Sequence, residues 1–207
     1  MLTRAKQAGD TLIEVLFAVT VFSLVVVGSF SIMNQGTNAV QHSLEITLVR
    51  QQIDAQAESL RFLHDSYVTA YQHNGSYTGP AAEWAKMLTS ITLTNATSAT
   101  SFTSIGTTCP SPPIGSFIIN STSASFLVSN AAVSLSPASG FAQVDYSTVP
   151  VSARGILIEA IRSPVSADLT QANSGYIDFH VLACWPVAGS EVPATIGTIV
   201  RLYDPRG

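Results

Sequence analysis

The residue most suggestive of chemistry near the start of the chain is Glu14. It lies in an apolar run of 22 residues, 12–33, in which it is the only charged side chain. An ionised carboxylate at the centre of a bilayer costs about 2.5–3.5 kcal/mol on insertion scales. A simple membrane anchor does not need such an acid. Glu14 is therefore the first candidate functional residue, and the chemistry it offers is pairing with a cation.

The two cysteines, Cys109 and Cys184, are the second candidate pair. Their wide separation does not match a metal-binding spacing. In an exported domain they would most simply form a disulfide with each other. In a cytosolic domain they would instead be two buried thiols, and the residues alone leave both interpretations open.

Motifs for catalysis are not found in the sequence. The four histidines, at positions 42, 64, 73 and 180, show no metal spacing, and there is no GxSxG, CxxC or phosphate-binding glycine loop. We therefore expect no enzymatic activity, no metal and no cofactor. The formal net charge is -4 and the only lysines are Lys6 and Lys86, so the charge does not indicate nucleic acid as a partner.

The elements that position Glu14 begin with one long helix, predicted over residues 10–72. Its first part is apolar all round and, at about 1.5 Å per residue, long enough to cross a bilayer core. After residue 34 the apolar positions recur at steps of three or four, which predicts an amphipathic helix. This apolar stripe consists of Ile46, Val49, Ile53, Ala57, Leu60, Leu63 and Tyr67.

The remainder of the chain predicts a head of short strands. Apolar and β-branched segments bounded by turn residues place strands at 116–120, 125–129, 141–146, 155–161, 176–184 and 195–203. A short helix is expected over 81–88, with Pro80 in its first turn. Sequential strands with short connections favour antiparallel pairing. We expect an α+β fold in which the second half of the long helix packs on a small antiparallel sheet.

The residues around Glu14 also match a known processing signal. The segment GDTLIEVL at 9–16, preceded by the basic residues Arg4 and Lys6, resembles the N-terminus of type IV prepilins and pseudopilins. A secretory signal peptide fits less well, because the apolar run is too long and acids occupy its start. The resemblance implies a long-helix pilin fold and cleavage by a prepilin peptidase between Gly9 and Asp10.

Four segments follow from this resemblance: a leader at 1–9, a transmembrane and filament-core helix at 10–33, its amphipathic continuation at 34–72, and a β-rich head at 73–207. Cleavage would give Asp10 a new α-amine, whose usual pKa of about 7.7–8.0 leaves it largely cationic near neutral pH. By the resemblance, this amine pairs with Glu14 of a neighbouring copy. The family usually has an aromatic residue, often N-methylated, where this chain has Asp10. The resemblance also implies that a Cys109–Cys184 disulfide pins the head.

The function expected on this basis is that of a structural subunit of a surface pilus, serving adhesion or twitching motility. Its partners would be copies of itself, other pilins, the prepilin peptidase, the assembly platform and the membrane. It would lie in the cytoplasmic membrane before assembly and in an extracellular filament afterwards. Two alternatives remain: a pseudopilin of a secretion or DNA-uptake machine, and a single-pass anchored binding domain that never polymerises.

Overall fold

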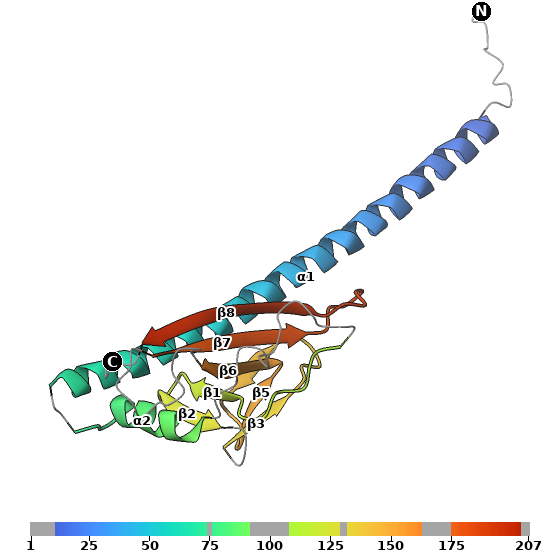
Figure 1. Cartoon of the computed structure of the whole chain (residues 1–207). Coiled ribbons are helices and arrows are strands. Elements are labelled where there is room, and N and C mark those ends of the chain that lie inside the picture. Colours follow the sequence, from blue (N-terminus) through green and yellow to red (C-terminus); the bar gives the residue numbers. More distant parts are fainter. Residues whose placement is uncertain (1–10, 74–75, 92–107, 129–131, 163–174, 204–207) are drawn as a thin grey trace, which may run out of the picture. The chain divides into compact units, whose positions relative to one another are not determined.

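The computed structural model describes residues 11–73, 76–91, 108–128, 132–162 and 175–203. The chain divides into two compact units, Met1–Leu44 and Glu45–Gly207. Helix α1, Thr11–Gln72, is 62 residues long and runs through both units (Figure 1). The long helix predicted from the sequence is therefore confirmed, with ends that agree to within one residue.

The second unit, which we call the head, contains a five-stranded sheet with the order β2-β1-β6-β7-β8. Every neighbouring pair in this sheet is antiparallel, as predicted. The β7–β8 ribbon keeps one continuous register from Tyr176↔Tyr203 to Trp185↔Ala194. The strands are β1 Phe117–Asn120, β2 Ser125–Val128, β6 Ile156–Arg162, β7 Tyr176–Trp185 and β8 Ala194–Tyr203.

A second sheet has three strands in the order β3-β5-β4, namely β3 Val133–Ser136, β5 Val151–Arg154 and β4 Gln143–Asp145. Only β4 was predicted from the sequence. The prediction of a purely antiparallel head needs correction here, because β3 and β5 pair in parallel. Strands of three or four residues, rich in serine, carry too little alternation of apolar and polar residues to be recognised.

Gly155 lies where the chain passes from β5 in the small sheet to β6 in the large one. Its N–H donates to the carbonyl of Ser136, and its own carbonyl accepts from the N–H of Cys184, both at 2.7 Å. Its φ of +67° is a conformation that side-chain-bearing residues rarely adopt. A glycine at this position therefore lets one backbone turn join the two sheets.

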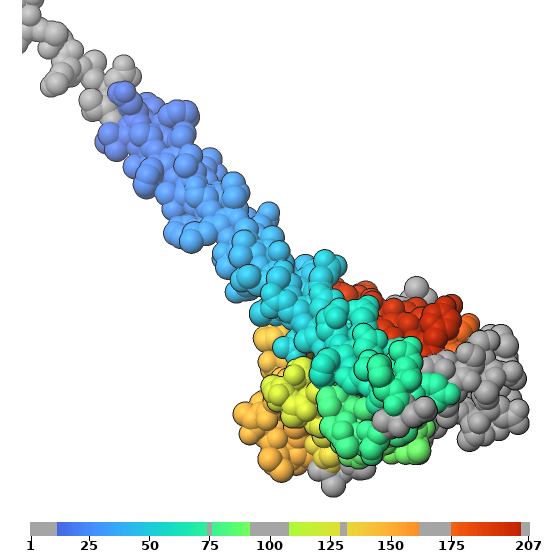
Figure 2. All heavy atoms as spheres, turned by 90° about the vertical axis from the view of Figure 1, so that its left-hand side faces the viewer, coloured from blue at the N-terminus to red at the C-terminus, as the bar shows by residue number. Residues whose placement is uncertain are grey.

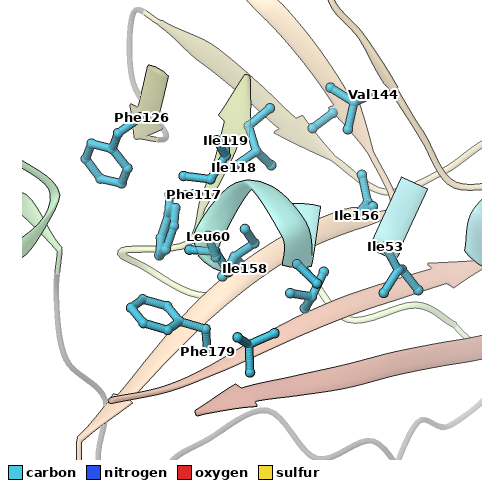
Figure 3. Close-up of a cluster of buried hydrophobic side chains, with 14 of the residues drawn as sticks. Ile53, Leu60, Phe117, Ile118, Ile119, Phe126, Val144, Ile156, Ile158 and Phe179 are labelled. Carbon is cyan, nitrogen blue, oxygen red and sulfur yellow. The ribbon is translucent and has the colours of Figure 1, made fainter. Parts of the chain in front are cut away.

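The core of the head lies between α1 and the large sheet. The members of the predicted stripe from Val49 to Tyr67 are all buried, which confirms this face of the helix. Figure 3 shows Ile53 and Leu60 of α1 among side chains from the strands, including Phe117, Ile158 and Phe179. Removing this apolar area from water stabilises the head by about 25 cal/mol per Å².

Helix α2, Pro80–Ser90, packs against β2, which forms one edge of the large sheet. Pro80 is its first residue, as expected, because the missing N–H has no partner at a helix start. One carboxylate oxygen of Glu83 accepts the N–H of Phe126 in β2 at 3.0 Å. The helix thereby covers this sheet edge and satisfies a backbone donor there.

Candidate functional site: an apolar helix with a single acid

The first unit presents apolar side chains around the whole helix. Among residues 12–44 no side chain is buried, and the large apolar side chains of 12–33 that are exposed keep 43–74% of their surface. A helix that is apolar on all sides is stable in lipid or in a protein core, but not in water. By length and composition, α1 is the one helix among the described residues that could cross a membrane. These properties indicate that the protein associates with a membrane.

Four hydroxyl groups of the first unit bond to their own helix. Thr20, Ser23, Ser29 and Thr37 each donate to a carbonyl three or four residues earlier, at 2.7–2.9 Å. In hydrocarbon an unsatisfied hydroxyl costs several kcal/mol, so this internal bonding makes the small polar residues compatible with lipid. These hydroxyls therefore need no partner outside the helix.

Glu14 cannot be satisfied in the same way. It lies exposed in the first turn of α1, where the positive end of the helix dipole favours an acid. The residues three and four positions later, Phe17 and Ala18, are apolar and offer no cation. Among the described residues no side chain forms an ion pair with Glu14. Any cation that pairs with this carboxylate therefore lies outside the described part of this chain.

The other residues of the predicted processing signal lie outside the described residues. These are Gly9 and Asp10 at the predicted cleavage site and the basic residues Arg4 and Lys6. Their roles remain predictions from the sequence.

The cysteines form a disulfide, Cys109–Cys184, with their Cα atoms 5.7 Å apart. The interpretation as two free thiols is therefore wrong. The bond ties the loop before β1 to the end of β7, directly before the fully buried Trp185. Disulfides persist mainly in oxidising compartments, so this bond is typical of an exported head.

Two polar residues that hold α1 on the head were not found from the sequence. Glu45 accepts a hydrogen bond from Trp185 Nε1 at 3.3 Å, and Gln56 is fully buried. The signal for Gln56 is its position, three residues after Ile53 and four before Leu60, which places an amide on the apolar face. That pattern marks the residue as buried, but it does not identify its partners.

Polar residues gather on the face of the large sheet that points away from α1. Arg201 makes two 2.7 Å bonds to the carboxylate of Asp178, and its guanidinium lies 3.9 Å above the ring of Tyr176. These bonds raise the pKa of Arg201 above its ordinary value. Burial lowers the pKa of His180, while the nearby carboxylates of Glu159 and Asp178 act in the opposite direction.

Among the residues that the structure describes, no group of three or more His, Cys, Asp or Glu side chains could hold a metal ion. Comparisons with protein-family models, curated proteins and solved structures give no match to this chain.

Proposed function

We propose that this chain is a structural subunit of a type IV pilus-like filament, made as a prepilin and cut after Gly9. In this proposal residues 12–33 hold each subunit in the membrane before assembly and form the filament core afterwards. The head lies on the outside of the filament. The partners are further copies of this chain, the prepilin peptidase and the assembly platform in the membrane.

The observation that carries the proposal is the single carboxylate of Glu14 on a helix that is otherwise apolar and exposed. A charge in hydrocarbon is strongly disfavoured unless a counter-charge accompanies it. The α-amine that cleavage creates at Asp10 of a neighbouring copy supplies this counter-charge. Pairing across copies favours assembly and also sets the axial register between helices, a use of buried polar groups that is known from other helical assemblies.

Two further observations support the proposal. The Cys109–Cys184 disulfide is consistent with a head exposed outside the cytoplasm. The core stripe of α1 from Val49 to Tyr67 packs on the sheet, so one helix joins the apolar segment to the head without a linker.

The proposal is tested by the mass of the intact mature chain and by electron microscopy of filaments sheared from the cells. We expect a mature chain that starts at Asp10 and filaments that contain it. We also expect a Gly9→Ala variant to be processed less completely. An uncut chain starting at Met1, or a cut near Ser29, would contradict the proposal and favour an anchored binding domain or a secretory signal peptide. Correct cleavage without surface filaments would favour a pseudopilin.

A further inference from the structure

A pocket of about 330 Å³ lies beside the disulfide of the head. Its walls come from three parts of the chain: the segment at Cys109, the segment that follows β3, and the loop 186–193 between β7 and β8. This loop is at the end of the β7–β8 hairpin away from α2 (Figure 1). Figure 2 faces the opposite end of the head, where α2 and the end of α1 reach the surface. A pocket of this volume is at the lower limit for ligand sites, so it can hold one side chain but not a large organic molecule.

The walls of the pocket are mainly apolar. They consist of the rings of Pro137, Pro186 and Pro193 and the side chains of Ala138 and Cys109. Ala138 lies directly against Gly155, because a Cβ placed on Gly155 would be only 2.6 Å from Cβ of Ala138. Sugars and other ligands with many hydroxyl groups would lose hydrogen bonds to water at such walls without regaining them. The walls therefore favour a ligand with apolar or flat surfaces.

The polar groups of the pocket are few, and one of them is a free carboxylate. Ser190 Oγ donates to the carbonyl of Val192 at 2.9 Å and accepts from its N–H at 3.2 Å, so this hydroxyl is occupied within the loop. Among the described residues that line the pocket, Glu191 alone is charged. Its carboxylate makes no ion pair with any side chain that the structure describes. The pocket thus combines apolar walls with one unneutralised negative charge.

The loop that carries Glu191 is already folded into a fixed shape. The Ser190 N–H donates to the carbonyl of Val187 at 3.1 Å, and Gly189 turns the chain with a φ of +81°. Prolines at both ends of the loop restrict its backbone further. The fully buried Trp185 pairs with β8 directly at the base of the loop. A loop held in this way loses little conformational entropy when a ligand binds.

We propose that this pocket binds the arginine side chain of a partner protein. The three-carbon stem of arginine is apolar and packs on apolar surface, while its guanidinium group is planar and forms two parallel hydrogen bonds with a carboxylate. A lysine ammonium is compact and more strongly hydrated, so it loses more on entering the pocket. An anion would be repelled by Glu191, and a divalent cation would find only one carboxylate as a ligand.

This inference goes beyond the proposed function and does not depend on it, because the pocket and its charge belong to the head alone. The partner is defined by its chemistry: a protein that presents an exposed arginine. The matching of Glu191 to a cation is the step that an experiment can isolate, because the charge of the ligand and the charge of the pocket can each be removed without changing shape.

A titration followed by nuclear magnetic resonance tests the ligand side of this match. The ¹⁵N-labelled full chain in detergent micelles is titrated with Nα-acetyl-arginine-N-methylamide, and separately with its citrulline and lysine analogues. A single side chain is expected to bind with a Kd of about 1 mM, so each titration extends to about 20 mM. We expect saturable shifts of the backbone amides of residues 187–192 with the arginine compound, and binding at least fivefold weaker with both analogues. No saturable shift in this loop, or equal binding of either analogue, would overturn the inference.

A pair of substitutions tests the pocket side. Glu191→Gln removes the charge and keeps the shape, and Asp54→Asn is the matched control at an exposed carboxylate of α1. Both side chains are exposed, so the head is expected to fold in both variants, as checked by thermal melting. We expect the Kd for the arginine compound to rise at least fivefold in Glu191→Gln and to stay within twofold in Asp54→Asn. An unchanged Kd in Glu191→Gln would show that the carboxylate does not recognise the ligand. Cleavage and filament yield do not enter these measurements, so the proposed function is tested separately.

Discussion

The side-chain amide of Gln56 pairs with both backbone groups of Ile119 as a neighbouring strand would. Gln56 Nε2 donates to the Ile119 carbonyl and Gln56 Oε1 accepts from the Ile119 N–H, each at 2.8 Å. Strand β1 meets β6 only at Phe117↔Ile158, so the sheet has already opened at Ile119. The same amide nitrogen donates to the Tyr146 hydroxyl at 2.9 Å. One buried glutamine of α1 thus closes the gap in the sheet and fixes how the helix lies on the head.

Replacing Gln56 with Met, which has a similar volume, would leave the Ile119 N–H without its partner and the Ile119 carbonyl with only the long bond from the Tyr146 hydroxyl, at 3.4 Å. Each buried unsatisfied group costs about 1–3 kcal/mol, so we expect the free energy of unfolding to fall by about 2–4 kcal/mol. Urea denaturation of the detergent-solubilised full chain measures this loss. Gln52→Met is the matched control, one turn earlier and only half-buried. If the two substitutions lower the free energy of unfolding equally, the hydrogen bonds between Gln56 and Ile119 do not add to the stability of the head.

Gly155→Ala tests the passage of the chain between the sheets. A Cβ at this position would lie 2.3 Å from the carbonyl oxygen of Cys184 and 2.6 Å from Cβ of Ala138. The positive φ adds strain of about 1–2 kcal/mol, and overpacking costs typically 1–3 kcal/mol more. We expect a loss of about 3 kcal/mol by urea denaturation. Gly189→Ala shares the positive φ but has nothing within 4 Å, so its loss should not exceed about 1–2 kcal/mol.

Reduction of the disulfide should destabilise the head without preventing insertion of the helix. The Cys109–Cys184 bond closes a loop with a sequence separation of 75 residues. In the chain-entropy model such a closure stabilises the folded state by about 4 kcal/mol. Urea midpoints measured with and without dithiothreitol test this value, with a Cys109→Ala, Cys184→Ala variant as the control that should not respond to reductant. If the urea midpoint of the natural chain is the same with and without dithiothreitol, the prediction is wrong.

The stability of the head should decrease as the pH falls below about 6.5, in part through His180. Burial lowers the pKa of His180 in the folded head, so the unfolded chain takes up the proton first as the pH falls. The stabilisation from His180 is thus present above the pKa that His180 has in the unfolded chain. It is lost as the pH falls toward the lower pKa of His180 in the folded head. We expect His180→Gln to flatten the decline in unfolding free energy between pH 7.5 and pH 5. His73→Gln, at an exposed histidine, should leave it unchanged.

Glu14→Ala should separate processing from assembly. The substitution removes the carboxylate but leaves Gly9 and the apolar segment in place, so we expect normal cleavage and at least a tenfold loss of filaments. Intact mass reports the cleavage and microscopy of sheared material reports the yield. Thr20→Ala is the control, because this hydroxyl bonds only to the Phe17 carbonyl of its own helix. Normal filament yield from Glu14→Ala would rule out the charge pair.

The long helix and its two characters were predictable, because they depend on local sequence. Side chains three and four positions apart lie on one helix face whatever the rest of the chain does, so the stripe from Val49 to Tyr67 was recognisable. The same holds for the long strands β7 and β8, which are rich in β-branched and aromatic residues. Glu14 was recognisable as a candidate functional residue because it is the only charged side chain in the apolar run of residues 12–33.

Other features were decided by the tertiary structure. The pairing of Cys109 with Cys184, the parallel contact of β3 with β5, and the partnership of Gln56 with Ile119 each join residues far apart in the chain. Such contacts depend on how the helices and strands pack against one another. The local periodicity of the sequence does not determine that packing. The sequence by itself determined an apolar helix with one acid, continued by an amphipathic helix. The tertiary structure decided which side chains of the head that helix meets, because these partners come from strands that lie far along the chain and depend on how the sheet assembles.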